Sequence, residues 1–310
     1  DCVMSLATQL GREGNVFADS AETVRHVHLN SPVLSQRKLR QLLAMPPYDS
    51  AYRYIELAFD PDAGIRAAIE HVCAQAEAAA REGVLLLILS DRRPRRGQVM
   101  LHALLATGAV HQHLVRAGRR CAVNLIVETG TARDPHHIAC LIGVGATAVY
   151  PYLAYQTLFD LGRRGILQIK KGGEQTQIGR SYRKGIYKGL SKIISKMGIC
   201  TISSYRGAQL FEIVGLDDAA VARCFDGTPS PIGVFTVIGR FKTEMSGFGT
   251  RFLRLNVPWG VYGIHGTNRP DSIGANASHG CIRLRVADAE ALYAMVPNGT
   301  RVYLEGGPYG

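Results

Sequence analysis

The amino-acid sequence predicts two parts of different fold class: an α/β segment of parallel βαβ units over residues 1–226 and a mainly-β domain over residues 227–310. Helical and apolar strand-like runs alternate between residues 63 and 150, which is typical of a parallel sheet covered by helices. After residue 233, short alternating runs are separated by Gly, Pro and Asn, which is typical of antiparallel sheet. A Gly- and Pro-rich stretch separates the two patterns, so we place the domain boundary near residue 227.

The α/β segment is predicted element by element from hydrophobic periodicity. Residues 1–60 contain only short helical pieces and turn signals, and a basic segment at 172–196 becomes helical. A strand at 199–203 and a helix at 207–214 close the segment. The alternating elements between these ends are helix 63–82, strand 84–90, helix 99–118, strand 122–128, helix 135–143 and strand 146–150.

The mainly-β part is predicted to contain short strands and one helix, at 288–295. Cys281 begins one strand, since Ile282, Arg283 and Leu284 alternate after it. The other expected strands are 234–241, 251–257, 261–266 and 301–304.

Composition limits the class of protein. The chain has 310 residues, 46% hydrophobic and 20% charged, which is ordinary for folded domains with a sizeable core. Its longest apolar stretch, 83–89, is far shorter than the ~20 residues that span a bilayer, so we expect no transmembrane segment. No signal peptide is visible and Asp1 opens the chain without Met, so we expect a fragment of unknown localisation.

The net charge of +11 comes partly from ten basic residues that lie from Arg163 to Lys196. Glu174 is the only acidic residue in this segment. Such a run can bind a polyanion. It lacks an interleaved aromatic groove or a zinc finger. We therefore interpret it as a solvated helix face and expect no nucleic-acid partner.

Neither cysteine nor histidine spacing predicts a metal or cofactor. The number of cysteines, seven, is odd, and no two of them form a Cys-x-x-Cys pair. The spacing therefore indicates no disulfide framework, no structural zinc site and no iron–sulfur cluster. The pairs His111/His113 and His136/His137 lack further ligands nearby and are expected to be surface or packing residues. Gly143-Val144-Gly145 follows a helix and precedes a strand, the reverse of a dinucleotide fingerprint, so we interpret it as a helix end and tight turn.

One constellation predicts covalent chemistry. His265 ends a strand and Cys281 begins another sixteen residues later, across a loop rich in Gly, Asn, Ser and Pro that can bring them together. A thiolate nucleophile needs a nearby base, and His suits that role near neutral pH. Gly280 permits a tight turn that would aim backbone amides at an oxyanion, and Arg283 shares a face with Cys281 where it could hold a carboxylate. The alternative, a buried Cys beside satisfied histidines, stays open.

Three motifs stand out in the mainly-β part: Thr228-Pro229-x-Pro231-x-Gly233-x-Phe235, His265-Gly266-Thr267 and Ser278-His279-Gly280-Cys281-x-Arg283. In these motifs residues 227–310 resemble the catalytic domain of L,D-transpeptidases, the YkuD-type enzymes that cross-link peptidoglycan. The match begins at the Thr-Pro turn, so the domain is expected to be N-terminally truncated.

This resemblance implies a β-sandwich-like fold and acyl transfer through a Cys281 thioester, with peptidoglycan stem peptides as partners and no cofactor. It implies that His265 accepts and donates the proton and that the Gly266 carbonyl orients His265. It also implies that His279, Gly280 and Cys281 shape the oxyanion site and that Arg283 and Ser278 bind substrate.

A second set of motifs lies in the α/β segment: Leu29-Asn30-Ser31-Pro32-Val33-Leu34, Ile88-Leu89-Ser90-Asp91-Arg92, Val127-Glu128-Thr129-Gly130, Ile142-Gly143-x-Gly145-Ala146, Ser195-Lys196-Met197-Gly198-Ile199 and Ser204-Tyr205-Arg206-Gly207-Ala208-Gln209. In these segments residues 1–226 resemble the central region of the glutamate synthase large subunit. In that family the region links an amidotransferase domain to an FMN barrel and carries no known chemistry.

Two functional hypotheses follow. The preferred one is a cysteine L,D-transpeptidase module in the cell envelope; the alternative is a non-catalytic glutamate synthase fragment, a cytoplasmic scaffold or interaction domain with an inactive tail. The resemblances meet at Gly227-Thr228-Pro229-Ser230, and we interpret this junction as an unnatural or accidental fusion.

Overall fold

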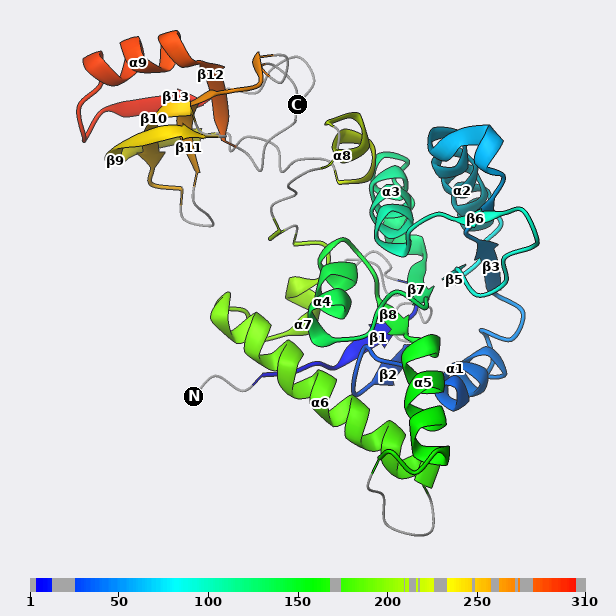
Figure 1. The fold of residues 1–310 in the computed structure, drawn as a ribbon. Coiled ribbons are helices and arrows are strands. Elements are labelled where there is room, and N and C mark those ends of the chain that lie inside the picture. Colours follow the sequence, from blue (N-terminus) through cyan, green and yellow to red (C-terminus); the bar gives the residue numbers. More distant parts are fainter. Residues whose placement is uncertain are drawn as a thin grey trace, which may run out of the picture. The chain divides into compact units, whose positions relative to one another are not determined.

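The computed structural model consists of two compact units, Asp1–Phe211 and Glu212–Gly310 (Figure 1), and each is described by itself. The first unit is α/β and the second is mainly β, in the order predicted from the sequence. The boundary expected near residue 227 lies outside the described residues. The residues that the structure describes are 4–12, 26–167, 174–208, 210–211, 216, 218–225, 233–246, 249–257, 262–270, 273 and 281–304.

A four-stranded parallel sheet forms the centre of the first unit, in the order β3-β5-β7-β8. β5 and β7 are buried along their whole length, as their continuous apolar sequences predict. β3 was not predicted, because four of its five residues are exposed and its sequence has no apolar run. The strands are β3 (Tyr52–Glu56), β5 (Leu86–Ser90), β7 (Asn124–Glu128) and β8 (Ala148–Tyr150).

Helices follow the strands in the βαβ manner predicted from the sequence. A segment at 32–34 adds to the edge of β8, since Val33 bridges Val149 in parallel, and α1 follows it directly. The α-helices are α1 (Gln36–Leu43), α2 (Gly64–Arg81), α3 (Ala103–Arg116), α4 (Pro135–Gly143), α5 (Tyr152–Arg163), α6 (Glu174–Lys196) and α7 (Ile202–Tyr205). The remaining elements are strands β1 (Thr8–Leu10), β2 (Val27–Leu29), β4 (Ala58–Phe59) and β6 (Val99–Met100) and the 3-10 turns Pro61–Ala63 and Arg120–Ala122.

α6 carries the basic run on its solvent side. Its apolar residues Ile178, Ile186, Leu190 and Ile194 are buried, a spacing that gives the helix one apolar stripe. The basic residues Arg180, Lys184, Lys188, Lys192 and Lys196 are exposed. The interpretation as a solvated helix face is therefore confirmed for these residues.

The end of the first unit differs from the sequence prediction. The strand predicted at 199–203 is wrong: Thr201 makes a single bridge to Ser5, and α7 begins at the next residue. The hydroxyls of Ser203 and Ser204 both contact Thr201 Oγ1, and such local hydrogen bonds compete with extended structure. The helix predicted at 207–214 is not found in its described residues, 207–208 and 210–211.

The second unit is a five-stranded sheet in the order β12-β11-β10-β9-β13. All neighbours are antiparallel except β11 and β12, which run parallel. α9 packs against this sheet through buried Ala289, and a Cβ at Gly266 would lie only 3.2 Å from Val286 Cα. The elements are α8 (Asp218–Cys224), β9 (Gly233–Ser246), β10 (Gly249–Leu255), β11 (Tyr262–Thr267), β12 (Ile282–Arg285), α9 (Val286–Met295) and β13 (Arg301–Leu304).

A tight turn at Gly145 joins α4 to β8 and packs on α3. Gly145 has φ +117°, and a Cβ there would lie 2.2 Å from His111 Nδ1. Arg120 fixes this contact, since its Nε donates to His111 Nδ1 at 2.9 Å and its Nη2 donates to the Gly145 carbonyl at 2.7 Å. The interpretation of Gly143-Val144-Gly145 as a helix end and turn is confirmed.

We expect Gly145→Ala to destabilise the first unit by about 3 kcal/mol or more, since it adds a steric clash to an unfavourable φ. Gly165→Ala is the matched control: its φ is +70° but nothing lies within 4 Å of the added Cβ. It should cost only about 1–2 kcal/mol. Hydrogen exchange of the β5 and β7 amides in the full chain measures both losses. Equal losses would show that the His111 contact is unimportant.

Candidate functional site

Four side chains form a row across the second sheet. Phe241 pairs with Phe252, Phe252 with His265, and His265 with Arg283, on β9, β10, β11 and β12 respectively. Paired residues point to the same face of a sheet. Their chain neighbours alternate to the other face, where Gly266 lies against α9. The row therefore occupies the face opposite α9.

His265 is held firmly in this row. Only 2% of the surface of His265 is exposed. Its ring stacks on Phe252, with the ring centroids 5.7 Å apart and an angle of 15° between the ring planes. Its Nδ1 lies 2.5 Å from the Gly266 carbonyl oxygen. A carbonyl can only accept, so Nδ1 carries the hydrogen, and in the neutral ring Nε2 is then the nitrogen able to take a proton.

Burial lowers the pKa of His265, because a charged imidazolium loses hydration inside the protein. The hydrogen bond to Gly266 raises this pKa and the nearby Arg283 guanidinium lowers it, and the net direction is downward. The imidazole is therefore neutral near pH 7, the state that a general base requires.

Cys281 immediately precedes β12 and is half-buried. It lies two residues before Arg283, so strand alternation directs both toward the face that carries His265. The structure thus places His265 and Gly266 on β11, Arg283 on the neighbouring parallel strand β12 and Cys281 directly before β12. The other predicted site residues, Ser278, His279 and Gly280, lie outside the described residues.

Phe252 is a site residue that sequence reasoning missed. A Cβ at Gly263 would lie 2.4 Å from the Phe252 ring, so the ring fits because that strand position has no side chain. The alternating sequence of 251–257 placed Phe252 on a strand. Only the register between β10 and β11 shows that it stacks on His265.

A second polar cluster lies at the carboxyl ends of β5 and β7 in the first unit. Ser90 and Glu128 are register partners, and Ser90 Oγ donates to Glu128 Oε2 at 2.7 Å. Arg92 Nη1 donates to the other carboxylate oxygen at 3.0 Å, and its guanidinium lies over the Tyr152 ring. Glu128 is only 4% exposed, so these donors replace the water that its carboxylate has lost.

The adjoining Asp91 repeats this arrangement. Thr129 Oγ1 donates to Asp91 Oδ2 at 2.5 Å, and the Gly130 amide donates to Oδ1 at 2.9 Å. The two runs Ser90-Asp91-Arg92 and Glu128-Thr129-Gly130 are thereby joined side by side. Sequence reasoning missed this cluster, although each polar run directly follows a buried strand, which is the signal that would have found it.

Histidines outside this row make local contacts with acidic residues. His113 Nε2 lies 2.7 Å from Glu77 Oε2, and the His137 amide is capped by Asp134. Among the described residues, no group of three His, Cys, Asp or Glu could hold a metal ion. Burial raises the pKa of Cys140, and it raises the pKa of Cys224 to about 11.

Comparison with known families follows the division into two units. Residues 1–217 match the glutamate synthase central domain, and residues 206–304 give a shorter match to the L,D-transpeptidase catalytic domain. Both resemblances seen in the sequence are thus confirmed. The first match covers most of the chain, so the chain belongs to the glutamate synthase central domain family.

The relatives are glutamate synthases from bacteria, plants and fungi. The chain is 41% identical over 231 residues to glutamate synthase (NADPH) large chain of Bacillus subtilis, a match that covers 74% of this chain and 15% of that protein. It is 38% identical over 247 residues to ferredoxin-dependent glutamate synthase 2, chloroplastic, of Arabidopsis thaliana, a match that covers 76% of this chain and 15% of that protein. It is 37% identical over 241 residues to glutamate synthase (NADH) of Saccharomyces cerevisiae, a match that covers 74% of this chain and 11% of that protein.

The chain therefore spans at most 15% of the length of these three relatives. Among solved structures, a flavocytochrome b2 mutant with benzoylformate has a TM-score of 0.35 at 14% identity, covering 59% of this chain and 42% of that one, a likeness too slight to bear on the fold. In the part of the chain that the structure describes, no helix is long and apolar enough to cross a membrane.

We expect Glu128→Ala to destabilise the first unit by about 3 kcal/mol, since it leaves Ser90 and Arg92 without their buried acceptor. The matched control is Glu82→Ala, which removes another Arg–Glu pair. Its pair with Arg53 is exposed, at 49% and 56% for the two side chains, so the loss should be below about 1 kcal/mol. Urea unfolding of the full chain compares them; equal losses would contradict a structural role for the Glu128 cluster.

Proposed function

We propose that the first unit is a non-catalytic scaffold or interaction domain, the role of the central region in a glutamate synthase large chain. The observation that carries this proposal is the match of residues 1–217 to that family, with 41% identity to a curated large chain. The activity that the relatives' names describe belongs to much longer proteins, of which this chain corresponds to one segment.

The chemistry of the strand ends supports a structural role. At the carboxyl ends of β5 and β7, the carboxylates of Asp91 and Glu128 accept hydrogen bonds from the neighbouring run. A general base must be able to reach substrate, whereas these acceptors are committed to holding two loops together. The cluster therefore fits a domain that maintains shape.

A chimera tests the scaffold role. Residues 1–217 replace the matched segment of the Bacillus subtilis large chain, and glutamate formation is measured. If the segment acts as a scaffold, the chimera retains activity, because no catalytic group has been exchanged. The control chimera carries Glu128→Ala and should give less folded protein. A soluble, folded chimera without activity would contradict the proposal.

A second candidate function is favoured by the row on the second sheet. We propose that residues 227–310 form an L,D-transpeptidase-like domain whose substrate is a peptidoglycan stem peptide. The observation behind it is the buried, neutral His265, oriented by the Gly266 carbonyl on the strand beside Cys281 and Arg283. The matching family segment, 206–304, contains all of these residues.

In this proposal His265 takes the Cys281 proton, and the thiolate attacks an amide carbonyl beside an L-centre. Backbone amides of His279, Gly280 and Cys281 stabilise the oxyanion, and Ser278 and Arg283 hold the substrate. His265 then protonates the leaving amine of the C-terminal D-residue, leaving a thioester on Cys281. The amine of a second stem resolves the thioester, which forms the cross-link and restores the thiol.

Electrophile labelling distinguishes an activated Cys281 from an ordinary thiol. Cys121 is exposed whereas Cys281 is half-buried, so accessibility alone predicts that Cys121 reacts first. We expect iodoacetamide at pH 7 to label Cys281 first, on the order of 10-fold faster, because a paired His raises the thiolate fraction. Mass spectrometry of the digested chain measures both rates.

His265→Ala is the control: it should slow the labelling of Cys281 and leave the labelling rate of Cys121 unchanged. With a tetrapeptide stem, the unsubstituted chain should gain an acyl adduct that Cys281→Ser lacks. Faster labelling of Cys121 in the unsubstituted chain, or no effect of His265→Ala, would remove the support for the transpeptidase reading.

A further inference from the structure

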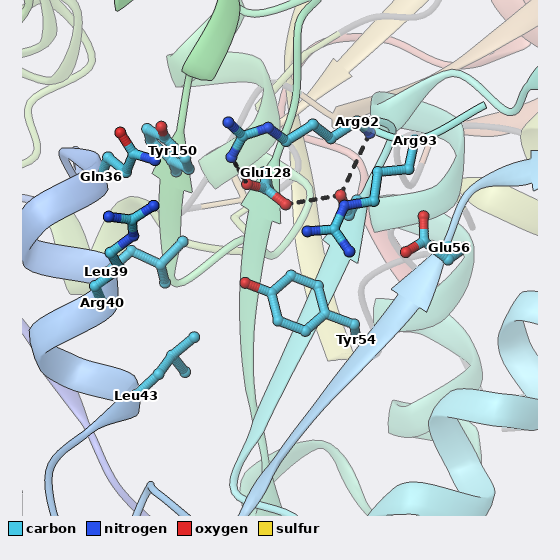
Figure 2. Close-up of a pocket in the computed structure, with 11 residues that line it drawn as sticks. Gln36, Leu39, Arg40, Leu43, Tyr54, Glu56, Arg92, Arg93, Glu128 and Tyr150 are labelled. Carbon is cyan, nitrogen blue, oxygen red and sulfur yellow. Dashed lines mark hydrogen bonds and ion pairs between the residues drawn. The ribbon is translucent and has the colours of Figure 1, made fainter.

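A cavity of about 480 Å³ opens at the carboxyl end of the parallel sheet in the first unit (Figure 2). The ends of β3, β5, β7 and β8 supply one wall, and α1 supplies the other. In open α/β sheets, ligands bind in the crevice outside the carboxyl ends of the strands. The cavity therefore lies where this architecture places a ligand.

Two arginines besides Arg92 face this cavity. Arg92 is paired with Glu128, as described above. Arg40 on the α1 wall and Arg93 on the strand wall line the same space, and neither side chain makes a hydrogen bond or ion pair within the described residues. Glu56 is the one further acidic residue of the lining, so the cavity keeps a positive balance.

The rest of the lining combines apolar and phenolic groups. Leu39 and Leu43 project from α1, opposite the Tyr54 ring in Figure 2. Partial burial and the nearby Glu128 carboxylate raise the pKa of Tyr54, so its phenol is neutral at pH 7 and can donate a hydrogen bond. Two guanidiniums, a neutral phenol and a short apolar wall complement a small organic molecule that carries an oxyanion.

A neighbouring hollow extends the same surface. Its volume is about 590 Å³, and it shares Glu56 and Arg93 with the first cavity while adding Arg95 and Gln98. The Arg95 amide is fixed by the Gln98 side-chain oxygen at 3.1 Å. Arg93 thus stands between two hollows, so a ligand whose oxyanion rests on Arg93 has space on either side.

We propose that this cavity binds a small organic anion, a phosphate ester or a dicarboxylate, through Arg40 and Arg93. The scaffold role does not assign any ligand to the first unit, so this binding site adds to it. The ligand joins α1 to the strand ends, and its binding stabilises the folded unit by an amount that grows with the logarithm of its concentration above Kd.

Isothermal titration of the full chain tests the proposal with two probes, phenyl phosphate and succinate, at low salt. At least one probe should bind in the millimolar range or tighter, and the tighter one identifies the oxyanion class. Arg40→Gln and Arg93→Gln should each weaken binding about 10-fold, the loss expected for one charge-assisted contact.

Arg37→Gln is the matched control, because Arg37 is exposed on the same helix but does not line the cavity. It should leave affinity unchanged, and thermal unfolding should show that all three variants are folded. Absence of binding by both probes, or equal weakening by Arg37→Gln, would overturn the proposal. Binding that survives both Arg40→Gln and Arg93→Gln would overturn it as well.

Discussion

The parallel register between β5 and β7 is the constraint on which the first unit depends. Both strands are buried on both faces, so any slip in register would move a continuous apolar run against polar loops. The correct register sets Ser90 opposite Glu128, and it lets the following runs exchange hydrogen bonds through Asp91 and Thr129. Packing therefore fixes the register, and the register in turn satisfies carboxylates that would otherwise be costly to bury.

Parallel pairing has a comparable consequence in the second unit. β11 and β12 are adjacent in the sheet although residues 268–281 separate them in sequence, and their register sets His265 beside Arg283. A hydrogen bond to the Gly266 carbonyl then fixes Nδ1 of His265, and stacking on Phe252 fixes the plane of the imidazole ring. An imidazole held at both an edge and a face is oriented before any substrate arrives, which is the preorganisation that proton transfer needs.

The sequence predicted the elements whose periodicity comes from burial and missed those set by tertiary contacts. The runs that became β5, β7 and β8 are short apolar stretches between helices, and each was predicted. β3 was missed because an edge strand with exposed Tyr52 and Tyr54 has no apolar pattern. Residues 199–203 were assigned to a strand because residue propensities do not include the hydroxyl contacts that form there. His265, Cys281 and Arg283 were predicted from their motif, whereas the positions of Phe252 and of the pocket arginines Arg40 and Arg93 depend on register and packing that no local pattern encodes.

The two units place polar groups at strand ends to different effect, and the difference lies in how donors and acceptors are matched. In the first unit the Glu128 carboxylate meets Ser90 and Arg92, so its acceptors are taken up inside the protein and the cluster contributes rigidity. In the second unit the one ring nitrogen of His265 that donates is held by Gly266, so the other nitrogen keeps its basic character and its lowered pKa keeps it neutral. A matched cluster stabilises a fold, whereas a neutral imidazole in a fixed tautomer is suited to accepting a proton. The hydrogen bonds in each unit, rather than the residue types alone, therefore separate a cluster that holds shape from a histidine whose tautomer is fixed.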